Sequence, residues 1–380
     1  MRYSFRLAEL LGHVPDPRRR PGTIKDIAEA TGLDRHQVAS LLKNEMKYIP
    51  LEALSRLCEF LVEKGYVSAD QLPGALFAIE TENFWELLAR RSRLELCVGI
   101  RRELNESYVA GGWVVASDSV LLGEVLNGVS SLGGTAKYAK SGTQPPHPEH
   151  IRQSLVLSPG VDSREAVLKR ASHVYQEFVD APNDKSLVCL GSVKSNPVVE
   201  LIFAEAFGCE PFTTQDTVAR PEDRSCPFMM RYRDDDPHPH SCSAGRDLAQ
   251  GVAAKAAGFY YEQKSGEWAC CRWSDSMQDT ALVFYIYRES QGRLEMVLSG
   301  FSGRATRLLS YTLNSSAEKF WPPVYKGHGI QIGAYLVQYR LAPQDDRSWD
   351  VLETEPPTDT RVIALDSEVI GRRIENNFNN

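Results

Sequence analysis

Five polar side chains within nine residues could recognise nucleic acid, because each can exchange hydrogen bonds with bases or phosphates. They are Arg35, His36, Gln37, Ser40 and Lys43. On a helix, the apolar residues between them turn inward and these five stay outside. Arginine can bond guanine twice, and glutamine can do the same with adenine. The spacing therefore predicts a helix that enters the major groove of DNA.

A second short helix is expected immediately before this one. Thr23 is placed to cap it by accepting from the free amides of its first turn. Gly32 can take the left-handed conformation that turns the chain sharply. Asp34 is expected to cap the following helix, where the helix amides must engage its charge close to the phosphates. Thr23 and Lys47, which flank the helix pair, complete the set of residues expected to contact DNA.

This helix pair resembles the helix-turn-helix of Cro/C1-type (Xre-like) repressors. The residues that carry the resemblance are the small Ala28 between the helices, Gly32 in the turn and Val38 in the recognition helix. The resemblance continues into the expected helices at Ile49–Leu61 and from Ser68 to Leu72. It implies a compact helical bundle over residues 20–76 that binds double-stranded DNA. We therefore predict a DNA-binding domain at 1–76.

The distribution of charge agrees with a DNA-binding head. The chain has 380 residues and a formal net charge of −7. Residues 1–47 contain nine Lys or Arg and six Asp or Glu, a local charge of +3, so the other 333 residues carry −10. An acidic body discourages non-specific wrapping of DNA. Arg18–Arg20 fits either phosphate contacts or a solvated loop.

Composition disfavours several other classes of protein. The chain is 42% hydrophobic and 24% charged, which is typical of a globular protein. No apolar run approaches the roughly 20 residues that span a bilayer, and no signal-peptide core follows the first residues. We therefore expect a cytoplasmic protein.

The cysteines and histidines do not predict a metal site. The eight cysteines are scattered without a CxxC pair, so buried free thiols are expected. The segment Asp234–Cys242 offers carboxylates, imidazoles and a thiol. Its prolines favour an extended, solvated loop, and no second ligand pair has a known spacing. We therefore predict no metal ligand.

The rest of the chain predicts an α/β body. Residues 77–95 are expected to form a helical connector. Beyond it, short apolar runs alternate with helical stretches, which indicates a Rossmann-like body at 96–342 with a strand-rich second half. Two lobes, at about 96–210 and 226–342, or one mixed sheet would both fit. A polar tail follows at 343–380, where residues 344–359 are expected to form a flexible linker and 362–365 to dock onto a sheet.

Parallel sheets place ligands at the carboxyl ends of their strands, and three predicted strand ends carry suitable residues. After the strand at 187–190 come Ser192, Lys194, Ser195 and Asn196, where the last can cap a helix. Free amides, hydroxyls and an ammonium group together could hold a phosphate or carboxylate. An ordinary tight turn with a good cap would explain the same residues.

The other two strand ends repeat this design. The strand at 294–299 is followed by Ser302, Gly303, Arg304 and Thr306, and the strand at 113–116 is followed by Asp118. Asp118 could accept a hydrogen bond from a ribose hydroxyl or cap the next helix. Together the three strand ends predict one crevice for a small anionic, nucleotide-like ligand.

These features favour a ligand-responsive transcriptional regulator. We expect a homodimer or higher oligomer on an inverted-repeat operator, with a nucleotide or cyclic nucleotide as effector and no certain cofactor. One alternative is an enzyme that acts on a nucleotide and carries a fused DNA-binding head. No catalytic constellation is visible, which argues against an enzyme. The other alternative is an oligomeric scaffold that binds DNA and no ligand.

Overall fold

The computed structural model describes residues 3–5, 7–11, 23–43, 45–67, 69, 72, 76–79, 83–102, 112–131, 147–182, 184–215, 223–246, 256–274, 277–327, 329–342 and 356–378. The chain divides into two compact units. The first comprises Met1–Glu82 with the short segments Arg288–Arg293 and Lys326–Ile330, and the body comprises the rest. Arg18–Arg20, most of the helix expected from Ser68 and most of the linker expected at 344–359 lie outside the described residues.

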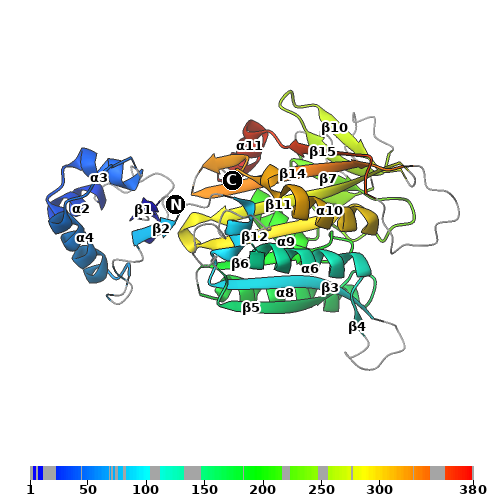
Figure 1. Ribbon diagram of the computed structural model, residues 1–380, viewed down its shortest axis with the longest axis horizontal. Helices are drawn as coiled ribbons and strands as arrows, with labels where there is room; N and C mark the ends of the chain where they lie inside the picture. Colours follow the sequence, from blue (N-terminus) through cyan, green and yellow to red (C-terminus); the bar gives the residue numbers. More distant parts are fainter. Residues whose placement is uncertain are drawn as a thin grey trace. The chain divides into compact units, whose positions relative to one another are not determined.

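Three helices form the centre of the first unit (Figure 1), as the sequence predicted. They are α2 (Thr23–Thr31), α3 (Arg35–Leu42) and α4 (Leu51–Glu63), and the short α1 (Leu7–Leu10) precedes them. Their apolar faces meet in one core, which contains Ile27, Leu33, Val38, Leu41, Leu42, Leu57 and Leu61. Strand β1 (Tyr3–Phe5) pairs antiparallel with β2 (Phe77–Ile79).

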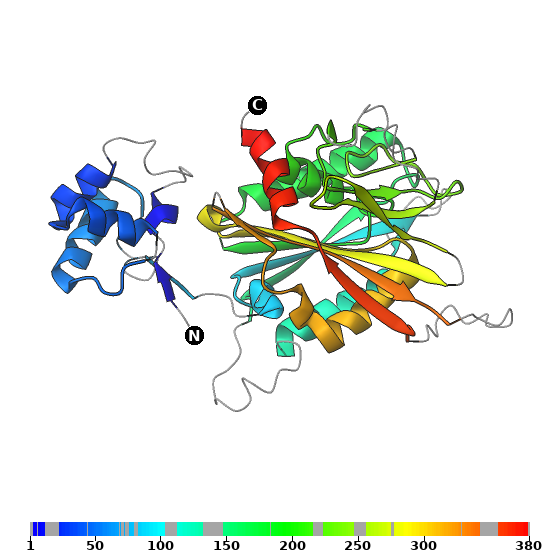
Figure 2. The same ribbon diagram turned by 90° about the horizontal axis from the view of Figure 1, so that it is seen from above.

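A nine-stranded sheet forms the centre of the body (Figures 1 and 2). Its order is β13-β14-β11-β12-β6-β3-β4, with β15 beside β14 and β5 beside β3. The strands are β3 (Arg93–Arg102), β4 (Gly112–Trp113), β5 (His150–Leu157), β6 (Lys185–Leu190), β11 (Gln278–Arg288), β12 (Arg293–Gly300), β13 (Tyr325–Gly327), β14 (Ile330–Arg340) and β15 (Asp359–Ala364). The expected docking of residues 362–365 onto a sheet is therefore confirmed, by the pairing of β15 with β14.

The strand pairing makes this sheet mixed. Strand β3 is parallel to β5 and to β6, so the helices between them are crossover connections. Strands β4 and β15 pair antiparallel with their neighbours. The body is thus a mixed α/β fold, and the narrower Rossmann-like expectation is not confirmed. Strands from both halves of the body share the sheet, so 96–210 and 226–342 are not separate lobes.

Helices cover both faces of the central sheet (Figure 2). Helices α6 (Ala116–Ser131) and α10 (Gly303–Ser316) lie side by side on one face, with α5 (Phe84–Ala89) against them. The other face carries α8 (Arg164–Asp180), α9 (Val198–Phe207) and α11 (Ser367–Phe378). Because both faces are covered, every residue of β6 and β12 is buried. Two 3₁₀ turns, at Glu289–Gln291 and Ala317–Phe320, complete the described helices.

A separate four-stranded sheet has the order β10-β9-β7-β8. Its strands are β7 (Phe228–Arg231), β8 (Ala244–Gly245), β9 (Gly258–Glu262) and β10 (Trp268–Arg272). The predicted hairpin at Lys264–Gly266 joins β9 and β10, with Gly266 at a φ of +87°. The Phe228 ring packs edge-on against Phe203 of α9 at 5.0 Å, which fixes this sheet to the helix.

One difference from the sequence prediction concerns the connector expected at residues 77–95. Residues 77–95 do not form one helix, because Phe77–Ile79 pairs with the N-terminal strand and, among the described residues of this range, only Phe84–Ala89 is helical. All six residues of α5 are buried, so this segment belongs to the core of the body. Among the described residues, no helix is long and apolar enough to cross a membrane.

The packing of α6 generates a stability prediction. A Cβ at Gly128 would lie 2.3 Å from the Trp85 ring, whereas a Cβ at Gly123 on the same helix meets nothing within 4 Å. Gly128→Ala should therefore overpack the core and lower the stability of the body by about 1–3 kcal/mol. Gly123→Ala is the matched control, and its better helix propensity should raise stability by up to about 1 kcal/mol. Urea unfolding of the full chain measures both, and equal effects would contradict the packing.

Candidate functional site

The turn between α2 and α3 has the geometry expected of a helix-turn-helix. Gly32 has a φ of +74°, and its amide donates to the carbonyl of Ala28 at 2.9 Å. The buried Thr31 hydroxyl donates to the Ile27 carbonyl at 2.6 Å and accepts from the amide of Leu33 at 3.3 Å. Leu33 is buried beneath the turn. These contacts fix the direction in which α3 leaves the turn.

A capping box begins α3. The Asp34 carboxylate accepts from the Gln37 amide at 2.8 Å, and the Gln37 side-chain carbonyl accepts from the Asp34 amide at 3.0 Å. The prediction that Asp34 caps this helix is confirmed. The cap also engages the charge of Asp34 with helix amides. It occupies the side-chain oxygen of Gln37, so the amide NH₂ of that residue is left to contact a base.

The residues proposed to contact DNA differ in exposure. Arg35, His36, Gln37, Lys43 and Lys47 are exposed, while Ser40 is half-buried. Thr23 is half-buried and is the first residue of α2. Among the residues that the structure describes, neither Arg35 nor the two lysines form an ion pair. Their positive charges are therefore available to an anionic partner.

The three predicted ligand loops of the body meet at one place. Asp118 lies beside the loop after β6, with its Oδ2 atom 3.4 Å from the Cβ position of Gly191. Ser117 Oγ lies 3.3 Å from the Cβ position of Gly303, in the loop after β12. The Lys194 ammonium donates to the carbonyl of Phe301 at 2.8 Å, which joins those two loops directly.

Several proposed ligand residues already have partners within the fold. Asn196 is fully buried, and its NH₂ donates to the carbonyls of Cys97 and Leu190. The hydroxyl of Ser195 donates to the Ser192 carbonyl at 3.2 Å. Thr306 Oγ1 donates to the Ser302 carbonyl at 3.1 Å. These bonds shape the loops rather than present groups to a ligand.

Lys194 belongs to a buried charge network. Its ammonium lies 3.0 Å from Asp236, and the guanidinium of Arg233 lies 2.7 Å from the other oxygen of that carboxylate. Burial opposes ionisation of Asp236, but bonds and charges from Arg233 and Lys194 outweigh it and lower its pKa. The expectation that Asp234–Cys242 is a solvated loop is wrong at Asp236, Ser241 and Cys242, which are buried. The charge of Lys194, which the tertiary structure brings to 3.0 Å from Asp236, compensates for the burial of this carboxylate. The sequence pattern did not predict that contact.

A second buried carboxylate, Asp279, supports the start of α10. It accepts a hydrogen bond from Ser302, which caps the helix by accepting from the Arg304 amide at 3.1 Å. Burial raises the pKa of Asp279, partly offset by these bonds and by the charge of Arg304. Gly303 is exposed at the first position of the helix and Arg304 is half-buried. The place where these segments meet thus combines buried acidic groups with the amides and cation of a helix start.

A cavity of about 320 Å³ lies beside the same β6–α9 loop. Its lining includes Val193 and Pro197 from that loop and the charged or polar residues Asp162, Arg164, Glu200, His238 and His240. The sequence signals did not indicate this cavity, because its walls come from four separate segments. The two histidines belong to the proline-rich segment Asp234–Cys242, which therefore forms part of the cavity wall.

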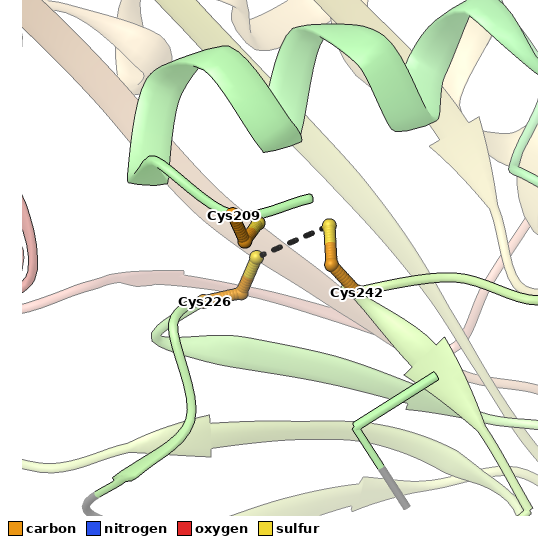
Figure 3. A group of neighbouring side chains, drawn as sticks. All are labelled: Cys209, Cys226 and Cys242. Carbon is orange, nitrogen blue, oxygen red and sulfur yellow. Dashed lines mark hydrogen bonds between the residues drawn. The ribbon is translucent and has the colours of Figure 1, made fainter. Parts of the chain in front are cut away.

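Three cysteines that are far apart in the sequence lie together in the body (Figure 3). The sulfur atoms of Cys209, Cys226 and Cys242 all lie within 4.8 Å of one another. Hydrogen bonds from Cys226 and then Cys242 lower the pKa of Cys209 to about 4, which favours its thiolate. The sequence predicts only separate free thiols at these positions, because no short spacing links them.

Comparison with known proteins identifies the first unit. Residues 18–63 match the family model of the Cro/C1-type HTH DNA-binding domain, which confirms the resemblance drawn from the sequence. This domain implies binding of double-stranded DNA and supports a DNA-binding regulator. No curated protein and no solved structure matches the chain.

The burial of Asp118 generates a prediction about pH. Burial raises the pKa of Asp118 from 3.8 to about 6, with Ser117 and Arg101 opposing the shift. The folded state therefore holds this proton more tightly than the unfolded state. Its contribution to the free energy of unfolding is present at low pH and is lost as the pH rises through about 6.

Asp118→Asn should remove this loss and stabilise the body near neutral pH by up to about 3 kcal/mol, with little effect at low pH. Chemical unfolding of the full chain as a function of pH measures the difference. Asp235→Asn is the matched control, because the Asp235 side chain is 83% exposed. The same pH dependence in the Asp118→Asn protein as in the wild type would rule out this carboxyl as its source.

Proposed function

We propose that this protein is a transcriptional regulator in which α3 reads an operator and the α/β body senses a small anionic ligand. The observation that carries the proposal is the match of residues 18–63 to a DNA-binding domain family, together with the exposed, unpaired cations on and after α3. The basic charge of residues 1–47 supports the same reading. The body has no comparable match, so its role rests on geometry.

DNA recognition would use the two ends of α3 differently. Arg35 and Gln37 lie in its first turn, where side chains of a recognition helix contact base edges. Lys43 follows its last turn and Lys47 lies beyond it, which suits them to phosphate contacts. A homodimer would place two such helices about 34 Å apart, one turn of DNA, and would select an inverted repeat.

Ligand sensing is supported by the convergence of two strand-end loops and the first turn of α6 in the body. The crevice holds a buried carboxylate of raised pKa, Asp118, opposite the exposed start of α10 at Gly303. Perturbed acids of this kind are concentrated at functional sites. A nucleotide or cyclic nucleotide suits Asp118 and the start of α10, because the helix start would favour a phosphate group and Asp118 could accept a hydrogen bond from a hydroxyl group. Regulation requires such a ligand to bind one geometry of the dimer better than another.

The recognition helix can be tested on operators selected from a random DNA library. Arg35→Ala should cost about 1–3 kcal/mol and relax specificity at one base position. Lys43→Ala should weaken binding to all sequences and reduce the salt slope by about 1. Lys64→Ala is the charge-matched control, because this exposed lysine lies at the end of α4.

Gln37 needs a variant that separates base reading from helix capping. Glu can replace Gln in a capping box, so Gln37→Glu should preserve the stability of the first unit while removing the amide donor. We expect a changed operator preference with an unchanged unfolding midpoint. Unaltered affinity and specificity in both the Arg35→Ala and Gln37→Glu proteins would show that α3 is not the recognition helix.

The sensing role predicts stabilisation by ligand. The midpoint of thermal unfolding of the full chain should be measured with and without each of a panel of nucleotides, including cyclic mono- and dinucleotides. A ligand at 100 times its Kd adds about 2.7 kcal/mol, which shifts the midpoint by a few degrees. Arg304→Gln should abolish the shift, whereas Lys169→Gln, an exposed change on α8, should not. Absence of any shift across the panel would favour a scaffold role for the body.

A further inference from the structure

The thiols of Cys209, Cys226 and Cys242 come from three separate segments of the body. Cys209 directly follows Gly208, which ends α9 in the left-handed conformation. Cys226 precedes β7, and Cys242 precedes β8 in the four-stranded sheet. Figure 3 shows the three side chains pointing toward one another below the end of α9. The meeting of these three side chains therefore brings the end of α9 together with the four-stranded sheet.

The spacing of the sulfur atoms fits coordination of a single ion. A zinc–thiolate bond is about 2.3 Å, so two sulfurs at neighbouring corners of a tetrahedron are about 3.8 Å apart. The Cys226 and Cys242 sulfurs are 3.9 Å apart, and all three lie within 4.8 Å. A disulfide would require about 2.05 Å. A multi-iron cluster would spread its cysteines more widely, because each would bind a different iron.

Two hydrogen-bonded clamps hold the three segments in place. Glu200 of α9 accepts from the amide of Cys242 at 2.7 Å and from the amide of Phe212 at 3.0 Å. Gln215 exchanges two hydrogen bonds with Ser225, the neighbour of Cys226. One clamp thus connects the chain after Cys209 to Cys242, and the other connects it to Cys226. Metal sites are typically supported by such outer contacts, which orient the ligands before the ion binds.

We propose that Cys209, Cys226 and Cys242 bind one zinc ion as three thiolates. Binding releases the thiol protons and links α9 to the second sheet. Cys226 and Cys242 are fully buried and Cys209 is half-buried, so access to the ion is from the side of Cys209. Among the described residues, no further Cys, His, Asp or Glu joins the group at this spacing. A water molecule completes the tetrahedron on the accessible side.

The metal content of the purified full chain tests this proposal. We expect about one zinc per chain by elemental analysis. The reduced, metal-free protein should take up Co²⁺ and show the thiolate charge-transfer and intense d–d absorption of a tetrahedral sulfur site. Cys209→Ser should lose most of both signals, and it is the variant least disruptive to the fold because this thiol is half-buried. Cys270→Ser, at another half-buried cysteine outside the group, is the matched control.

A second variant tests the site without removing a ligand. Glu200→Gln preserves the shape of the clamp but weakens its hold on the amides of Cys242 and Phe212. It should lower zinc affinity by roughly 10–100-fold in competition with a chromophoric chelator. Failure of the reduced wild type to bind Zn²⁺ or Co²⁺ would overturn the proposal. Retention of full metal binding by the Cys209→Ser protein would also overturn it. So would the finding that protein whose free thiols are alkylated at lysis contains no metal and has a disulfide between Cys226 and Cys242.

Discussion

The body depends on one buried amide, that of Asn196. Its NH₂ donates to the carbonyls of Cys97 on β3 and Leu190 on β6, at 3.0 and 3.2 Å. Its oxygen accepts from the amide of Val198 at 3.2 Å, at the start of α9. One fully buried side chain thus joins two parallel strands to the helix that follows them. An apolar residue there would leave these backbone groups without their partner, at a cost of about 1–3 kcal/mol each.

This junction positions groups in the loop after β6 and on α9. The loop it fixes crosses β3 so closely that a Cβ at Gly99 would lie 2.0 Å from the Ser195 carbonyl. The loop carries Lys194 to the carbonyl of Phe301 and to Asp236. It also leads into α9, which carries Glu200 to the cysteine group. The proposed ligand crevice and the proposed zinc site therefore both depend on the same strand end.

The two units use buried and exposed charge in opposite ways. In the first unit, the capping box satisfies Asp34 with helix amides while Arg35 and Lys43 stay exposed. In the body, Asp118 in the first turn of α6, Asp236 after β7 and Asp279 near the start of β11 are buried. Ionising a buried carboxylate costs stability unless a cation or donor compensates. Asp236 has such compensation from Arg233 and Lys194, whereas Asp118 has little, which makes it the chemically distinctive residue of the crevice.

The sequence by itself determined what depends on local periodicity and local capping. Residues 23–43 encode two helices and a glycine turn within a few residues, so the DNA-binding domain and the Asp34 cap could be predicted. The apolar runs that form β6 and β12, and the turn of the β9–β10 hairpin, could be predicted for the same reason. The tertiary structure decided which distant residues meet. Cys209, Cys226 and Cys242 are 17 and 16 positions apart, and Lys194 and Asp236 are 42 apart, so no local pattern links them. Such contacts follow from sheet order and helix packing, which are set by the burial of the whole core.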